Sequence, residues 1–138
     1  MVQNIYPIRF DNLIGRAYVK ISGEINATKI SNTFLAIAMN KSWVEGDRSV
    51  LWKIENAFFP ELFEFSEIIK TAQITSAFTK PGKSAFVVDQ NSEMQKMVAN
   101  FYKSLAATTT DRKIELFFSE KEAIIWLDSQ QPPYTGSI

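Results

Sequence analysis

Residues 85–105, AFVVDQNSEMQKMVANFYKSL, hold in one stretch the two patterns that decide the fold. The run Ala85–Val88 is apolar throughout, which is typical of a strand covered on both faces of its sheet. Ser92 and Gln95 then form a capping box, a pair of side chains that satisfies free backbone N–H groups where a helix begins. The apolar residues after it recur at helical spacing. The stretch therefore predicts a strand followed by a helix with the stripe Met94, Met97, Val98, Phe101, Tyr102 and Leu105.

Strand and helix patterns alternate on both sides of this unit. Period-two alternation and apolar runs predict the other strands, and apolar stripes at spacings of three and four predict the other helices. Asn26 favours the start of the first helix, and Ser119 with Glu122 forms a second capping box. The other predicted elements are strands at Ile5–Phe10, Leu13–Ser22, Val50–Ile54 and Ile114–Phe118, a helical stripe from Ala27 to Ala38 ending near Asn40, a helix from Pro60 into the seventies, and a short helix after Ser119.

The order of these elements is β-β-α-β-α-β-α-β-α. After an opening hairpin, strands that alternate with helices imply parallel pairing and right-handed crossovers. The sequence thus predicts an α/β fold with a mixed, mostly parallel five-stranded sheet. We expect a single domain over residues 1–128. Residues 129–138, which contain two prolines and a glycine, are expected to form a flexible C-terminal tail.

The composition excludes several classes of function. The chain has no Cys and no His, so disulfides, thiol nucleophiles and the usual general base and metal ligand are absent. Fifteen basic residues balance fifteen acidic ones, and this argues against bulk nucleic-acid or anionic-membrane binding. The N-terminus has no signal-peptide pattern, and no apolar run reaches the roughly 18 residues of a membrane span. We expect a cytoplasmic protein.

Acidic residues lie near the carboxyl ends of the predicted strands, at Glu24, Glu55, Asp89 and Glu120. Ligands of open α/β sheets bind at that edge, so a Mg²⁺ site or a paired-carboxylate acid/base site is one hypothesis. The other is structural, because Asp89 and Glu120 precede helices whose amino ends favour negative charge. The structural interpretation is preferred, since no fixed spacing unites the four residues. We therefore predict no catalytic residue, no metal site and no cofactor.

The segment after the third strand is rich in phenylalanine and glutamate. Phe58, Phe59, Leu62, Phe63 and Phe65 cannot all face one stripe of a single helix. One interpretation is an exposed surface that binds a protein partner or an apolar ligand. The other is that the loop folds under and fills the core. For the Met94, Met97 and Phe101 stripe, core packing is favoured over an adaptable pocket.

The local sequence resembles the SpoIIAA-like, or STAS, fold of anti-sigma-factor antagonists, and more closely the small stand-alone bacterial proteins of that fold. Five stretches carry the resemblance. They are Val19–Ile25 at the second strand and the turn after it, Val50–Asn56 at the third strand, Ala85–Val88 at the fourth strand, Ile114–Phe118 at the closing strand, and Ser119–Leu127 at a helix with the pattern S-x-x-E-A-x-x-W-L. The resemblance implies a regulatory domain that acts through protein contacts.

The chain departs from the antagonists at one position. They carry an Asp-Ser-Ser-Gly-like segment after the third strand, and its serine is phosphorylated by a partner kinase. The corresponding residues here, Glu55-Asn56-Ala57-Phe58-Phe59, contain no hydroxyl and no glycine. The resemblance therefore does not bring a phosphoserine switch to this chain.

These observations favour a non-enzymatic regulatory or protein-binding domain of STAS-like fold. The predicted surface lies around residues 55–67, and the partner is another protein or a second copy of the chain. A small apolar-ligand or lipid-binding domain is the alternative, and a carboxylate enzyme using Glu55 and Asp89 is the third hypothesis. The predicted partner- or ligand-binding residues are Glu55, Asn56, Phe58, Phe59, Phe63 and Asp89.

Overall fold

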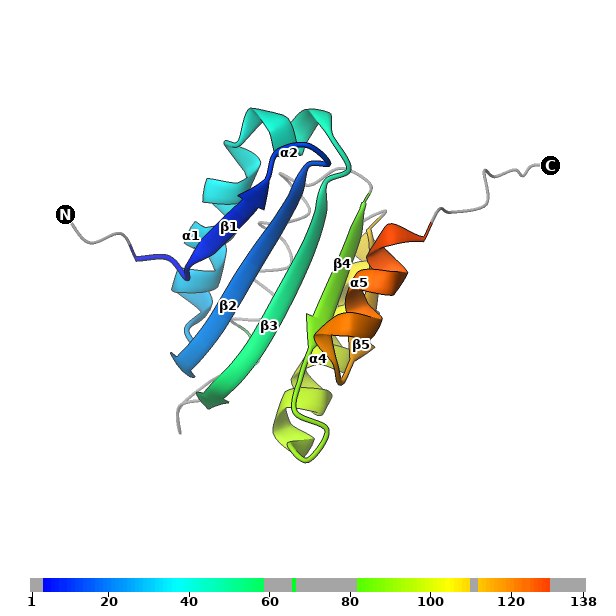
Figure 1. The fold of residues 1–138 in the computed structure, drawn as a ribbon. Helices are drawn as coiled ribbons and strands as arrows, with labels where there is room; N and C mark the ends of the chain where they lie inside the picture. The colour runs from blue at the N-terminus through cyan, green and yellow to red at the C-terminus, as the bar shows by residue number, and fades with distance from the viewer. Residues whose placement is uncertain (1–3, 59–65, 67–81, 110–111, 130–138) are drawn as a thin grey trace.

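A five-stranded sheet forms the centre of the protein, with its strands in chain order (Figure 1). The computed structural model describes residues 4–58, 66, 82–109 and 112–129. An antiparallel hairpin opens the sheet, and the remaining neighbours pair in parallel. This confirms the predicted α/β fold with a mixed, mostly parallel sheet. The strands are β1 (Ile8–Asp11), β2 (Arg16–Glu24), β3 (Ser49–Phe58), β4 (Lys83–Val87) and β5 (Lys113–Phe117).

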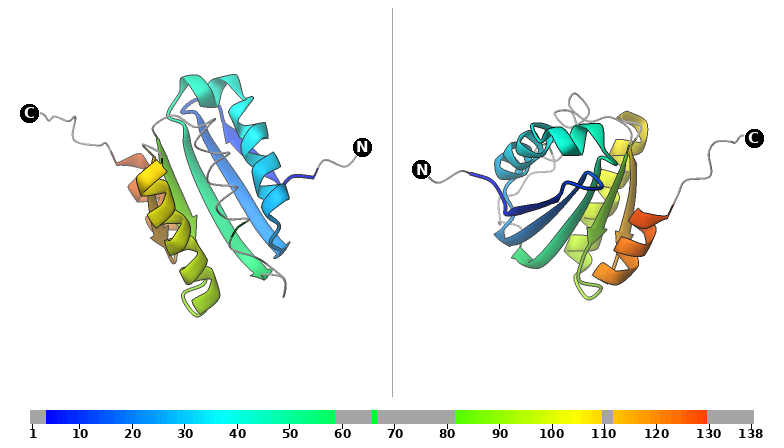
Figure 2. Two further views of the ribbon diagram at one scale, coloured as in Figure 1. Left: turned by 180° about the vertical axis from the view of Figure 1, so that it is seen from behind. Right: turned by 45° about the horizontal axis from the view of Figure 1, so that its top comes forward.

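The helices divide between the two faces of the sheet. Figure 2 shows α1, α2 and α4 on one face, while α5 lies on the other. Their bounds are α1 (Ala27–Ala38), α2 (Lys41–Glu45), α4 (Glu93–Thr109) and α5 (Glu120–Asp128). The helix predicted from Pro60 into the seventies falls outside the described residues, as do residues 130–138 of the predicted tail.

Two predicted helix starts and one predicted helix end are confirmed, and one short helix was not predicted. The Asn26 side chain accepts a hydrogen bond from the Lys29 N–H at 2.9 Å, and Ser119 Oγ accepts one from Glu122 at 3.1 Å. The first helix ends at Ala38, which confirms the end predicted near Asn40. The short helix α2 was not predicted, and the Asn40 side chain caps it by accepting from the Trp43 N–H at 2.9 Å. One asparagine therefore follows one helix and begins the next.

Alternate residues of β3 form the cores on the two faces. Val50 and Trp52 pack with Phe34 and Ile37 of α1 on the first face. Leu51 packs on the second face with Ala85 and Val87 of β4 and with Ala123 and Leu127 of α5. The Trp52 ring lies 5.1 Å from Phe34 and 6.1 Å from Phe86, centroid to centroid. Burial of these large rings is a main source of stability for a sheet of this size.

Three cationic side chains are buried at the amino ends of the parallel strands, which we call the amino edge. They are Arg16, Lys83 and Arg112, at 3%, 8% and 7% exposure. Burial of a charge is costly unless it is paired or hydrogen-bonded. Each of these side chains meets that condition, so the amino edge is a closed network.

The partners of these cations connect distant parts of the chain. Arg16 donates to Ser49 Oγ and to the Asp128 carboxylate, both at 2.9 Å. Arg112 Nη2 donates to Ser84 Oγ at 2.9 Å and to the carbonyls of Arg48 and Lys83 at 2.9 and 3.0 Å. Lys83 Nζ donates to Trp126 O at 3.0 Å, to Ser129 Oγ at 3.1 Å and to the Ser129 carbonyl. The carboxyl end of α5 is therefore fixed to β2 and β4.

Candidate functional site

The carboxyl end of β3 is irregular at the residues singled out from the sequence. Ile21 pairs with Ile54 and Gly23 with Ala57, so β3 holds one more residue than β2 between these pairs. Asn56 has a left-handed φ of +51°, a conformation that Asn tolerates better than most residues. The sequence predicted that the strand ends at Glu55-Asn56. It continues through this bulge to Phe58, because the Phe58 carbonyl accepts from the Ile25 N–H at 2.8 Å.

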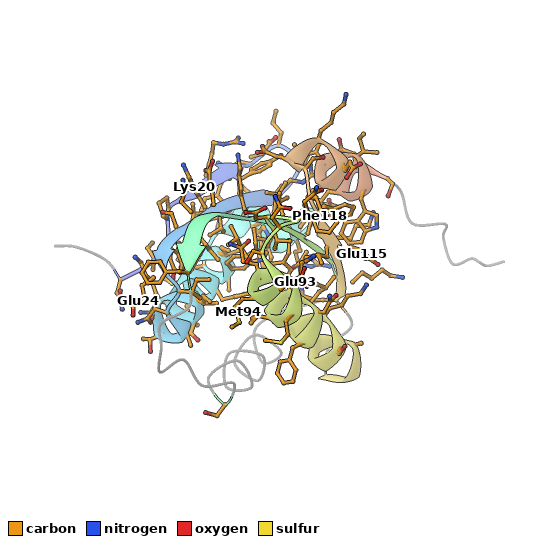
Figure 3. The ribbon with its side chains drawn as sticks, turned by 90° about the horizontal axis from the view of Figure 1, so that it is seen from below. Lys20, Glu24, Glu93, Met94, Glu115 and Phe118 are labelled. Carbon is orange, nitrogen blue, oxygen red and sulfur yellow. The ribbon has the colours of Figure 1, made fainter. Side chains whose placement is uncertain are left out.

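A pocket of about 430 Å³ opens beside this bulge, at the carboxyl ends of β3 and β4 and at the start of α4. We call it the edge pocket, and we call this side of the sheet the carboxyl edge. Figure 3 looks onto the carboxyl edge, with Glu93 and Met94 at the start of α4 and Glu24 at the end of β2. The lining residues include Lys53, Glu55, Asn56, Asp89, Ser92 and Gln95.

Gln95 links the elements around the edge pocket, a role that its place in the predicted capping box does not indicate. Its Nε2 donates to the Ala57 carbonyl at 3.4 Å, and its Oε1 accepts from the Asp89 N–H at 3.0 Å. Ser92 Oγ accepts from the Gln95 N–H at 3.2 Å, as the predicted capping box requires. The buried Gln95 amide, however, bridges the end of β3 and the loop after β4 instead of returning to Ser92. It thereby ties α4 to the bulged strand.

The structure does not gather the four candidate carboxylates. Glu55 and Asp89 both line the edge pocket. Glu55 nevertheless bonds to Lys20 of β2 at 3.2 Å, on the side of β3 away from β4. Asp89 Oδ1 accepts from the Asn91 N–H at 2.9 Å, while Glu120 pairs with Lys53 at 3.1 Å. Within residues 4–58, 66, 82–109 and 112–129, no group of three acidic residues is placed to hold a metal ion.

Ion pairing keeps Glu55 and Lys53 charged. The pKa of the Glu55 carboxyl is lowered mainly by the hydrogen bond from Lys20 and further by the charges of Lys20 and Lys53. The hydrogen bond to Glu120, followed by the charges of Glu120 and Glu55, raises the pKa of Lys53. A carboxylate held this way is a poor proton acceptor near neutral pH. It can still contribute fixed charge to the rim of a binding surface.

Large apolar side chains lie exposed around the edge pocket. Phe58 is 58% exposed, Met94 and Met97 are each 48% exposed, and Phe101 is 38% exposed. The prediction that the Met94, Met97 and Phe101 stripe packs into the core is therefore wrong for Met94 and Met97. The buried residues of α4 include Gln95, Val98 and Ala99, which lie on a different face of the helix. Phe59 and Phe63 lie outside the described residues.

Comparison with protein-family models, curated proteins and solved structures gives no match to this chain. The structure defines a small α/β domain with a five-stranded mixed sheet in the order β1-β2-β3-β4-β5. Over the described parts of the chain, no helix combines the length and the apolar character needed to cross a membrane.

Proposed function

We propose that this protein is a non-enzymatic regulatory domain of STAS-like fold that binds a protein partner at its carboxyl edge. The observation that carries the proposal is the exposure of three large apolar side chains beside a polar pocket. We call these residues the contact surface: Phe58, Met94 and Met97. Exposed apolar clusters with a polar rim mark protein interfaces more often than isolated exposed residues do.

The geometry of α4 favours a contact surface and argues against a loosely packed core. Met94, Met97 and Phe101 are separated by three and four residues, so they share one face of the helix. Val98 and Ala99 are nearly fully buried, which means that α4 already has a face packed against the protein. The methionine face is thus additional apolar surface. Methionine adapts its shape to a partner because its side chain is unbranched and polarisable.

The bridge made by Gln95 joins Phe58 to this helix face. Gln95 donates to the carbonyl of Ala57, the neighbour of Phe58, and it follows Met94 directly in the chain. Glu55 and Asp89 line the pocket between these elements and supply a charged rim. A partner with apolar side chains and basic or amide groups would complement this arrangement.

The resemblance to anti-sigma-factor antagonists supports the same location. Their phosphorylated segment follows the third strand, where this chain has the bulge at Glu55-Asn56-Ala57. Here the position carries an ionised carboxylate and no hydroxyl. The proposed contact is therefore not switched by phosphorylation at this position.

The hypothesis of an apolar-ligand or lipid-binding domain stays a prediction. It requires an apolar cavity of a few hundred Å³. The edge pocket has the volume, but Lys53, Glu55, Asn56 and Asp89 line it. This lining favours a polar contact over the enclosure of a lipid.

Site-specific photocrosslinking tests the proposed contact. A benzophenone amino acid is placed at Met94 or Met97 in cells that express the protein naturally, with Ile125 on α5 as the exposed control position. We expect a discrete adduct from positions 94 and 97 and none from 125. An adduct of twice the chain's mass identifies the partner as a second copy. Equal adducts from all three positions, or no adduct from 94 and 97, would contradict the proposal.

A further inference from the structure

A second pocket lies on the sheet face that carries α5. Figure 1 shows the strands β1, β2 and β3 uncovered on this face, with α5 beside them over the later strands. The pocket has a volume of about 240 Å³, and we call it the face pocket. Since α4 covers the opposite face of the sheet, the face pocket is separate from the contact surface.

The face pocket is locally basic in a chain with no net charge. Arg9, Lys20 and Lys53 contribute three positive charges to its lining, and Glu120 contributes one negative charge. Its remaining lining is mostly apolar and includes Pro7, Leu51 and the ring of Tyr18. The combination of an apolar floor with a cationic rim suits a ligand that is apolar at one end and anionic at the other.

Two of the three cations lie side by side. Lys20 of β2 and Lys53 of β3 are partners in the strand register, so their side chains project from neighbouring positions. Like charges at such positions repel and weaken a sheet. Glu55 at 3.2 Å from Lys20 and Glu120 at 3.1 Å from Lys53 offset the repulsion. Exposed ion pairs of this kind are weak and exchange readily, so a bound anion can replace them.

Arg9 completes the rim. Its guanidinium lies 4.1 Å above the centre of the Tyr18 ring. This cation–π contact holds the guanidinium beside the pocket and does not by itself occupy its N–H donors in hydrogen bonds. In the part of the chain that the structure describes, no carboxylate pairs with Arg9. Buried Arg16 and Arg112 differ, because their donors are taken up by the amino edge.

We propose that the face pocket binds a small molecule in which an oxyanion, a carboxylate or a phosphate, is attached to a compact apolar body. The Arg9 guanidinium and the ammonium groups of Lys20 and Lys53 hold the oxyanion. Pro7, Leu51 and the Tyr18 ring contact the body. A volume of about 240 Å³ lies below the roughly 300–1,000 Å³ typical of drug-sized ligands, so the body is no larger than a single ring.

Titrations followed by amide NMR on the full chain test this site. The probes are phenyl phosphate and benzoate, with inorganic phosphate and benzyl alcohol as the anion-only and body-only controls. We expect phenyl phosphate or benzoate to give saturable shifts at Arg9, Tyr18, Lys20 and Lys53, and the stronger of the two identifies the oxyanion. We expect each control to bind at least about tenfold more weakly, since each lacks half of the proposed contacts.

Variants separate a built site from general charge attraction. Arg9→Gln and Lys53→Gln change exposed side chains and should each weaken binding of the better probe about tenfold or more. Lys41→Gln, on exposed α2, is the matched control and should leave the affinity unchanged. Shifts spread equally over Lys29 and Lys41, equal binding of benzyl alcohol, or no saturable shift in the face pocket would overturn the proposal. Lys53 lines both pockets, whereas Arg9 lines the face pocket and not the edge pocket. The Arg9→Gln result is therefore independent of the proposed partner binding.

Discussion

The two edges of the sheet differ in the burial and the pairing of their polar groups. At the amino edge, Arg16, Lys83 and Arg112 are buried, and each makes hydrogen bonds or ion pairs that cross between elements. At the carboxyl edge, Glu55 and Asp89 are solvent-accessible and the backbone at Asn56 is left-handed. Large apolar side chains stand exposed beside them.

This difference separates the edge of the sheet that stabilises the fold from the edge that is proposed to bind a partner. Buried and fully bonded charges are costly to disturb, so the amino edge tolerates little change. The carboxyl edge has a pocket, a bulge and unburied aromatic and methionine side chains, features whose alteration costs little folding free energy. Substitutions at matched positions of the two edges should therefore lower the free energy of unfolding by amounts that differ several-fold.

The largest effect is expected at Arg112. Arg112→Met removes the donors to three acceptors, Ser84 Oγ and the carbonyls of Arg48 and Lys83. Each buried acceptor left unsatisfied costs about 1–3 kcal/mol, so we expect a loss of about 4 kcal/mol in the free energy of unfolding, measured by urea denaturation. The exposed Arg9→Met is the matched control and should change it by less than about 0.5 kcal/mol. Similar losses for both variants would contradict the contrast.

Two glycines provide a direct comparison of the edges. Gly15 and Gly23 both have left-handed φ angles, +80° and +75°. A Cβ on Gly15 would lie 2.7 Å from Gly46 Cα, whereas a Cβ on Gly23 meets no atom within 4 Å. The left-handed backbone alone costs about 1–2 kcal/mol with a side chain present, and overpacking adds about 1–3 kcal/mol.

We therefore expect Gly15→Ala to lower the free energy of unfolding by about 3 kcal/mol and Gly23→Ala by about 1 kcal/mol. Thermal and urea unfolding of the two variants measure the difference. Because the backbone conformations are alike, the excess at Gly15 is the steric part. Equal losses would show that the crowding at the amino edge relaxes without cost.

The smallest effect concerns the charge at the carboxyl edge. Lys20→Gln removes the main cause of the lowered pKa of Glu55, so we expect that pKa to rise toward its ordinary value of 4.5. A lowered folded-state pKa stabilises the fold above the unfolded value and loses this contribution as the pH falls through the folded value. Carboxyl ¹³C NMR titration of Glu55 measures the change, with Lys41→Gln as the control. An unchanged pKa in Lys20→Gln would show that the ion pair does not form in solution.

Strand and helix alternation was sufficient to predict the sheet. Apolar runs such as Ala85–Val88 fix strands, and the helices between them require parallel pairing. The short helix α2 was missed because it rests on one cap, Asn40, which also suited a helix end. The extension of β3 was missed because the bulge at Asn56 depends on pairing with β2, and period-two alternation carries no sign of it.

The site was predicted less well, for physical reasons. Glu55, Asn56, Phe58 and Asp89 do lie at one edge of the sheet, because carboxyl ends of parallel strands meet there. Helical spacing predicts that Met94, Met97 and Phe101 share a face, but it does not decide whether that face is covered. The capping box identified Gln95 but not its bridge to Ala57, and no pattern identified Arg16, Lys83 or Arg112. These roles arise from partners distant in the sequence.

The order of the strands has a consequence for how the protein is made. Each strand of the sheet lies beside the one that precedes it in the chain. During synthesis, every new strand therefore finds its neighbour already present, and no strand must insert between two others. The contacts of Asp128 with Arg16 and of Ser129 with Lys83 form only after α5 has emerged. The amino edge thus closes after the five strands are made and secures a sheet assembled one strand at a time.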